Sequence, residues 1–124
     1  VCGVVDTLKY LKKGGRIPAS LALIGEALNL KPSLIIANGV IETLGKSRGM
    51  KQGISKVYAE YEKAPVSEHW PVYFGYVKEK KPGTDFLNDT CEKYGIEEKH
   101  LYPVGPTIGV HTGPGCIVLA FVRD

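Results

Sequence analysis

The chain has 124 residues, of which 44% are hydrophobic and 23% are charged, and its formal net charge is +3. This composition is typical of a single globular domain, and so small a charge does not by itself predict nucleic-acid binding. The three cysteines form neither a CxxC pair nor a metal-ligand spacing, and no apolar run is long enough to span a membrane. We therefore expect a cytoplasmic domain without a disulfide framework or a metal site.

The first segment predicts a short amphipathic helix. Val4, Leu8 and Leu11 follow helical spacing, and Gly14-Gly15 is a usual helix stop. Cations at this end suit the helix dipole, so simple helix-end electrostatics and contact with an anion or a partner are both open. The basic residues concerned are Lys12, Lys13 and Arg16.

A second helix is predicted to begin at Pro18, because proline suits the first helical turn, and to end near Lys31-Pro32. Its apolar residues lie on more than one side. This pattern is typical of a helix that is buried in the core or lines an apolar cavity. The apolar face consists of Leu21, Ile24, Ala27 and Leu28, and Leu23 and Leu30 widen it.

The middle of the chain predicts a β-hairpin followed by a helix. Two β-rich runs, 33–37 and 40–44, flank Asn38-Gly39, which is the strongest short-range hairpin signal. A basic loop, Gly45 to Gly49, comes next. From Met50 onward, apolar residues with a 3.6 period predict a helix of about fourteen residues.

The remaining elements complete a mixed sheet. Strands are predicted at 71–77, 101–104 and 116–122, and 78–81 is a charged loop. Thr84 or Asp85 can cap a helix that Gly95 ends. The sequence thus predicts an α/β fold in which helices pack on a mixed sheet of about five strands.

The segment from Pro103 to Gly115 contains four glycines and three prolines. Since glycine opens unusual backbone conformations and proline removes a donor, we expect a shaped loop at the edge of the sheet. His111 and Thr112 at its centre could hydrogen-bond an anion, and Gly113 and Gly115 could bring backbone N–H groups close to it. A structural histidine in a tight turn fits the same pattern equally well.

Four segments, in this order, resemble the C-terminal domain of the DegV family of bacterial fatty-acid-binding proteins. Each is weak alone, but together with the strands between them they cover nearly the whole chain. The segments are Leu8 to Ile17 (LKYLKKGGRI), Ala27 to Pro32 (ALNLKP), Leu44 to Gly49 (LGKSRG) and Val104 to Gly115 (VGPTIGVHTGPG).

The resemblance implies that residues 1–124 are a C-terminal lipid-binding lobe and that the family's N-terminal lobe is missing. In the family, two α/β domains enclose a long-chain fatty acid, and some members present it to a fatty acid kinase without performing chemistry themselves. His111 matches the histidine that hydrogen-bonds the carboxylate, with Thr112 and Gly113 beside it. Arg16 and Arg48 match basic positions near the mouth of the site, where the kinase subunit docks.

The resemblance also implies contacts with the acyl tail from the second helix, for instance from Ile24 and Leu28. The ligand is then a long-chain fatty acid, and no cofactor is expected. The chain begins at Val1 without a methionine, which agrees with a fragment of a longer protein.

Two other functions remain open on the residues alone. A small hydrolase or transferase could use His111 as the base with Cys116 or Thr112 as the nucleophile. The segment Val104 to Gly115 holds no acidic residue to orient that histidine, and Cys116 is expected to point into the core. A regulatory or nucleic-acid-binding module could instead use basic residues, namely Lys12, Lys13, Arg16, Lys46 and Arg48.

Overall fold

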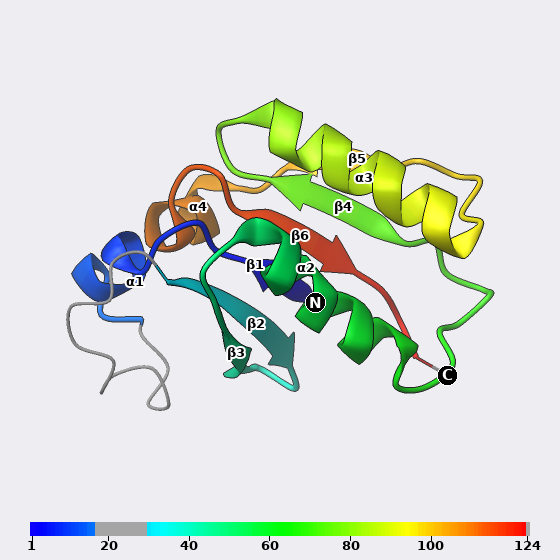
Figure 1. The fold of residues 1–124 in the computed structure, drawn as a ribbon, viewed down its shortest axis with the longest axis horizontal. Coiled ribbons are helices and arrows are strands. Elements are labelled where there is room, and N and C mark those ends of the chain that lie inside the picture. The colour runs from blue at the N-terminus through cyan, green and yellow to red at the C-terminus, as the bar shows by residue number, and fades with distance from the viewer. Residues whose placement is uncertain (17–29, 124) are drawn as a thin grey trace.

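A computed structural model of the chain describes residues 1–16 and 30–123 (Figure 1). Its six strands form one sheet in the order β3-β2-β1-β6-β4-β5, in which β4 and β5 are parallel and all other neighbours are antiparallel. The predicted mixed α/β sheet is confirmed, with one strand more than expected. The strands are β1 (Cys2–Val4), β2 (Lys31–Ala37), β3 (Val40–Ser47), β4 (Tyr73–Tyr76), β5 (Leu101–Pro103) and β6 (Ile117–Ala120), and the helices are α1 (Lys9–Lys13), α2 (Met50–Glu62), α3 (Lys80–Tyr94) and α4 (Pro106–Thr112).

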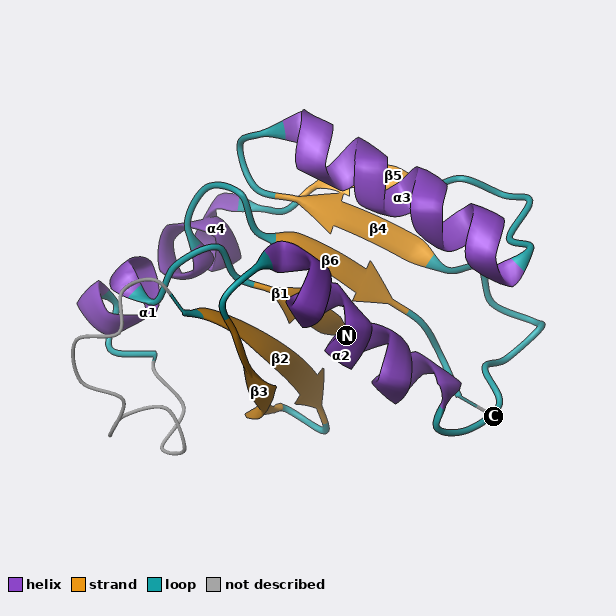
Figure 2. Ribbon diagram, viewed as in Figure 1, coloured by secondary structure: helices purple, strands orange, loops and turns teal. Residues whose placement is uncertain are grey.

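Helices α2 and α3 cover one face of the sheet (Figure 2). Alternate strand residues point toward them, so Val4 and Leu119 are buried against Val57 of α2 and the ring of Phe86 in α3. Gly53 allows α2 to approach closely, because a Cβ at that position would lie 2.7 Å from Val4 Cγ1. The main core is therefore the layer between the sheet and these two helices.

The predicted hairpin is confirmed. Asn38 and Gly39 both have positive φ, 53° and 75°, which are the angles of a turn that matches the twist of the flanking strands. β2 and β3 pair antiparallel from Ala37↔Val40 to Lys31↔Ser47. The second strand runs three residues further than predicted, so most of the expected basic loop at 45–49 lies in β3.

The start of the chain differs from the prediction. Val4 belongs to strand β1 rather than to a helix, and the helix there is only α1. β1 lies between β2 and β6 in the middle of the sheet and pairs with both. The Val4 side chain is fully buried there. The predicted second helix, with Ile24 and Leu28, lies outside the described residues.

Two later boundaries also differ. α3 begins at Lys80, ahead of the predicted caps Thr84 and Asp85, and Pro82 fits its first turn, where backbone N–H groups lack helical partners. The helix ends at Gly95, with φ of 66°, as predicted. The strands predicted at 71–77, 101–104 and 116–122 are present with shorter bounds as β4, β5 and β6.

The segment predicted to be an open loop contains helix α4. Pro106 occupies its first position, where a missing N–H costs nothing, and Gly113 ends it with φ of 79°. Gly109 inside the helix would place a Cβ 3.5 Å from Val77 Cγ1, an ordinary contact. The glycines and prolines therefore delimit a short helix rather than prevent one.

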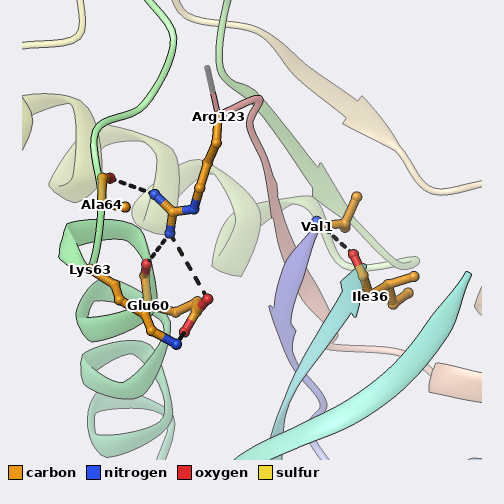
Figure 3. A network of polar contacts seen from close by, with 6 residues as sticks. All are labelled: Val1, Ile36, Glu60, Lys63, Ala64 and Arg123. Atoms are coloured by element: carbon orange, nitrogen blue, oxygen red, sulfur yellow. Dashed lines mark hydrogen bonds and ion pairs between the residues drawn. The ribbon is translucent and has the colours of Figure 1, made fainter. Parts of the chain in front are cut away.

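Polar contacts fix the ends of the central strands (Figure 3). The Arg123 guanidinium, just beyond β6, donates to the carbonyl oxygens of Glu60 and Ala64 at the end of α2, and it lies 3.9 Å from a Glu60 carboxylate oxygen. Val1 N donates to Ile36 O of β2 at 3.0 Å. These contacts tie β6 to α2 and β1 to β2.

Candidate functional site

The face of the sheet opposite α2 and α3 carries an apolar groove of about 290 Å³. It follows from strand alternation, since Ile117 and Leu119 of β6 turn toward the helices while Val118 turns the other way. Among the described residues, Thr112 and the cysteines supply the only polar side chains on its walls. The lining residues are Val1, Cys2, Gly3, Val5, Leu34, Ile36, Val104, Ile108, Thr112, Cys116 and Val118.

A shallower hollow of about 410 Å³ shares Val104 and Val118 with the groove and continues toward β4 and β5. Large apolar side chains stand exposed along this face: Ile36 is 37% exposed and its cross-strand partner Ile41 39%. Ile108 of α4 is 48% exposed. A contiguous exposed apolar surface of this kind marks a site that a ligand or another protein covers.

Helix α4 contributes Ile108 and Thr112 to the groove wall, and α1 packs against α4 (Figure 1). Thr112 lies on the last turn of α4 and lines the groove, and its hydroxyl donates to Ile108 O at 3.2 Å. Of the predicted ligand-binding residues that the structure describes, Thr112 is thus the one that lies on the groove wall.

His111 is half-buried on the same turn and does not line the groove. Its ring packs on Gly14, where a Cβ would lie 2.0 Å from the ring Nδ1. That nitrogen is buried and has no hydrogen-bond partner among residues 1–16 and 30–123. The ring of His111 therefore packs between its own helix, α4, and the end of α1.

Gly113 and Gly115 were expected to offer backbone N–H groups to a ligand. The structure uses both internally: Gly113 N donates to Gly109 O at 2.8 Å, and Gly115 N donates to Val77 O at 3.1 Å. These two groups do not form the expected anion nest. Gly113 serves instead as the surface on which the Tyr10 ring lies, since a Cβ there would be 2.2 Å from Tyr10 Cδ2.

Cys116 forms the floor of the groove and is 1% exposed. Its predicted position in the core is confirmed. Burial raises the pKa of the Cys116 thiol to about 11, although the hydroxyl of Thr112 acts in the opposite direction. A thiol that ionises so poorly is a weak nucleophile, which disfavours the cysteine version of the enzyme hypothesis.

Arg16 and Arg48 are both exposed, and they follow α1 and β3 respectively. Arg16 donates to Gly14 O at 3.0 Å, and neither arginine forms an ion pair with a described residue. Lys12 and Lys13 are exposed on α1 and Lys46 on β3, so the basic residues come from separate elements.

Sequence reasoning missed the strand residues of the groove. Val118 could have been found from alternation within 116–122, because it is the residue between two core positions. Gly3 and Val5 could not, since β1 is too short to show a period of two.

In the described ranges no group of three potential metal ligands occurs, and no helix there is long and apolar enough to cross a membrane.

A family model described as "Uncharacterised protein, DegV family" matches residues 2–124. A DegV domain-containing protein of Streptomyces coelicolor is 38% identical over 118 residues, which cover 91% of this chain and 41% of that protein. Among solved structures, a stearic-acid-binding protein from Eubacterium ventriosum matches with a TM-score of 0.80 and 27% identity, covering 98% of this chain and 43% of that one.

A DegV family protein from Thermus thermophilus, described as binding fatty acid, matches with a TM-score of 0.73 and 28% identity over 95% of this chain and 43% of its own. The chain thus spans about two-fifths of the length of these relatives. Because the family model covers all but the first residue, the chain belongs to the DegV family.

Proposed function

We propose that the chain forms one wall of a site that encloses a long-chain fatty acid. The observation that carries this proposal is the apolar groove on the face of the sheet opposite α2 and α3, where Thr112 and the thiols are the only polar side chains that the described residues bring to the wall. Fatty acid binding by the relatives from Eubacterium ventriosum and Thermus thermophilus supports the same ligand class. The acyl chain lies along Leu34, Ile36 and Val118, and the carboxylate lies at the α4 end.

The small size of the groove indicates that a second wall is needed to enclose the acyl chain. Its volume, about 290 Å³, is at the small end of ligand pockets, which are typically about 300–1,000 Å³. Each buried methylene contributes about 0.8 kcal/mol, so an acyl chain that lies on an open face forgoes much of its binding energy. We assign the other wall to an N-terminal lobe that belongs to the same protein and is absent from residues 1–124.

The carboxylate then needs a few placed donors. His111, on the last turn of α4, supplies one, and Thr112 supplies another when its hydroxyl turns away from Ile108 O, with Gly113 closing the turn and the Arg16 cation near the mouth. We also propose that Ile24 and Leu28 contact the acyl tail of the fatty acid. The chain performs no chemistry itself in this proposal, and Arg16 and Arg48 form the surface on which a fatty acid kinase docks.

The test uses the two-lobe protein and native mass spectrometry to detect co-purified fatty acid. Val118→Asp places a carboxylate in the middle of the groove and should abolish retention, because burying that charge against an acyl chain is costly. Val122→Asp is the matched control, since Val122 is 43% exposed and does not line the groove. If both variants retain fatty acid like the unchanged protein, the groove is not the binding wall.

A further inference from the structure

The contact between α1 and α4 is built from two rings and two glycines. The ring of Tyr10 in α1 lies on Gly113 at the end of α4, and the ring of His111 in α4 lies on Gly14 at the end of α1. A Cβ at Gly113 would come within 2.2 Å of Tyr10 Cδ2, and one at Gly14 within 2.0 Å of His111 Nδ1. Each helix thus presents an aromatic ring to the only residue type that leaves room for it.

Gly14 covers a specific edge of the histidine. The site of its missing Cβ is 2.0 Å from Nδ1, 2.7 Å from Cε1 and 3.2 Å from Cγ, so the backbone of α1 shields the Nδ1 side of the ring. Of the two ring nitrogens, only Nδ1 is buried without a hydrogen-bond partner among the described residues. Nε2 is therefore the nitrogen through which this ring can meet a ligand.

The shielding also affects where the imidazole proton resides. A proton on Nδ1 would create a buried N–H without an acceptor, and orphaned buried donors are both costly and rare. With the proton on Nε2, the ring presents a donor to its open side, which is the group that a carboxylate accepts from. Both considerations favour the same tautomer.

We propose that Gly14 is a positioning residue for His111: it packs against the Nδ1 edge of the ring and holds the neutral imidazole in the Nε2–H tautomer, as a fixed donor to the ligand's anionic head group. The ligand in this statement rests on the proposed function, whereas the orientation and the tautomer do not. A glycine that only let two helices approach would leave the histidine proton free to occupy either nitrogen.

The experiment is nitrogen NMR on this chain with ¹⁵N-labelled histidine and no fatty acid, at a pH of about 8, where imidazole is neutral. The chain has three histidines, so a His111→Gln variant assigns the signals of His111, and exposed His69 serves as a solvent reference. The penalty for an orphaned donor predicts an excess of the Nε2–H form over the Nδ1–H form of about tenfold or more.

Gly14→Ala should reduce that excess, because its Cβ displaces the ring and admits water to Nδ1. Gly109→Ala is the matched control: it adds a methyl group to α4 with only an ordinary 3.5 Å contact to Val77, and it should leave the tautomer unchanged. If amide spectra show that Gly14→Ala does not fold, Tyr10→Leu replaces it, since without the Tyr10 ring on Gly113 the end of α1 is no longer held on α4 and Gly14 moves off the Nδ1 edge of His111.

Comparable tautomer populations in the unchanged chain, or a proton mainly on Nδ1, would overturn the proposal. So would an unchanged tautomer ratio in Gly14→Ala or in its replacement. Because no fatty acid is present, this result does not depend on the proposed function. A protein that fails to bind fatty acid leaves the tautomer measurement standing, and a failed tautomer measurement leaves fatty acid binding open.

Discussion

At the scale of single residues, the buried thiol of Cys116 gives a direct chemical prediction. Burial raises its pKa from 9.0 to about 11, so at pH 8 its thiolate fraction is about a hundredfold below that of an ordinary cysteine. We expect iodoacetamide to label Cys116 far more slowly than free cysteine, as followed by peptide mass spectrometry. A rate equal to or above that of free cysteine would restore the enzyme hypothesis.

The same thiol links stability to pH. Its pKa is raised in the folded state, so the folded protein holds the thiol protonated while the unfolded chain ionises. The contribution to stability is complete below about pH 9 and is lost as the pH rises toward about 11. Burial acts in the same direction on the pKa of Cys2.

The two exposed arginines also carry a prediction at this scale. Under the proposed function, Arg16→Ala and Arg48→Ala in the two-lobe protein should impair acyl phosphorylation by a kinase more than fatty acid binding, because neither side chain lies on the groove wall. Lys63→Ala is a control for the loss of an exposed cation, since Lys63 lies at the far end of α2 (Figure 3). Normal kinase turnover in both arginine variants would show that they are only solvated charges.

At the scale of elements, the β2–β3 hairpin depends on the backbone of its turn. Gly39 has φ of 75° and nothing lies within 4 Å of the position that a Cβ would take, so any cost of a side chain comes from backbone conformation alone. Gly39→Ala should lower the free energy of unfolding by about 1 kcal/mol, measured by urea denaturation. Gly39→Asn should cost less, because asparagine tolerates this region, and equal losses would argue against the explanation.

The contact between the end of β6 and α2 is a second element-scale feature. Arg123 donates to two carbonyl oxygens and its side chain is 30% exposed, so Arg123→Ala should lower the free energy of unfolding by about 1–2 kcal/mol. Lys63→Ala removes a more exposed cation 3.8 Å from the same Glu60 and should cost under about 0.5 kcal/mol. Thermal unfolding of both variants compares the two losses of stability. Similar losses in Arg123→Ala and Lys63→Ala would contradict a specific role for Arg123.

Local signals explain which elements the sequence could predict. The hairpin, α2 and the end of α3 at Gly95 depend on turn chemistry and helical period within short windows, and all three are confirmed. β1 was missed because its last residue, Val4, follows a helical spacing with Leu8 and Leu11, while its strand character comes from distant partners. α4 was missed because its proline and glycines, which mark its ends, have the composition of a loop.

The candidate site was predictable only in part, for the same reason. The motif around His111 and Thr112 identified one end of the groove. The apolar wall required knowledge of which strand neighbours which, and β1 and β6 meet only in the folded sheet. The close fit of His111 on Gly14 joins two short helices far apart in sequence, and no local pattern indicates it.

At the scale of the whole molecule, the open face limits what this chain can bind alone. Losing half the burial of a sixteen-carbon chain removes about 6 kcal/mol, or about four orders of magnitude in affinity. We therefore expect calorimetric titration of the isolated chain with palmitate to show weak binding or none. Submicromolar one-to-one binding to the monomer would show that this lobe encloses the tail by itself.

The central position of β1 has a consequence for how the chain folds. Cys2 pairs with Leu119 and Val4 with Ile117, so one side of the sheet's middle strand is completed only by residues from the other end of the chain. On the other side, β1 pairs with β2. During synthesis on a ribosome, the hairpin of β2 and β3 forms early. β1 cannot pair with β6 until the end of the chain has been made, and until then the apolar side chains of β1 stay exposed. Contacts of such long sequence separation slow folding, so the sheet closes as a late event and chaperones have a long interval in which to act.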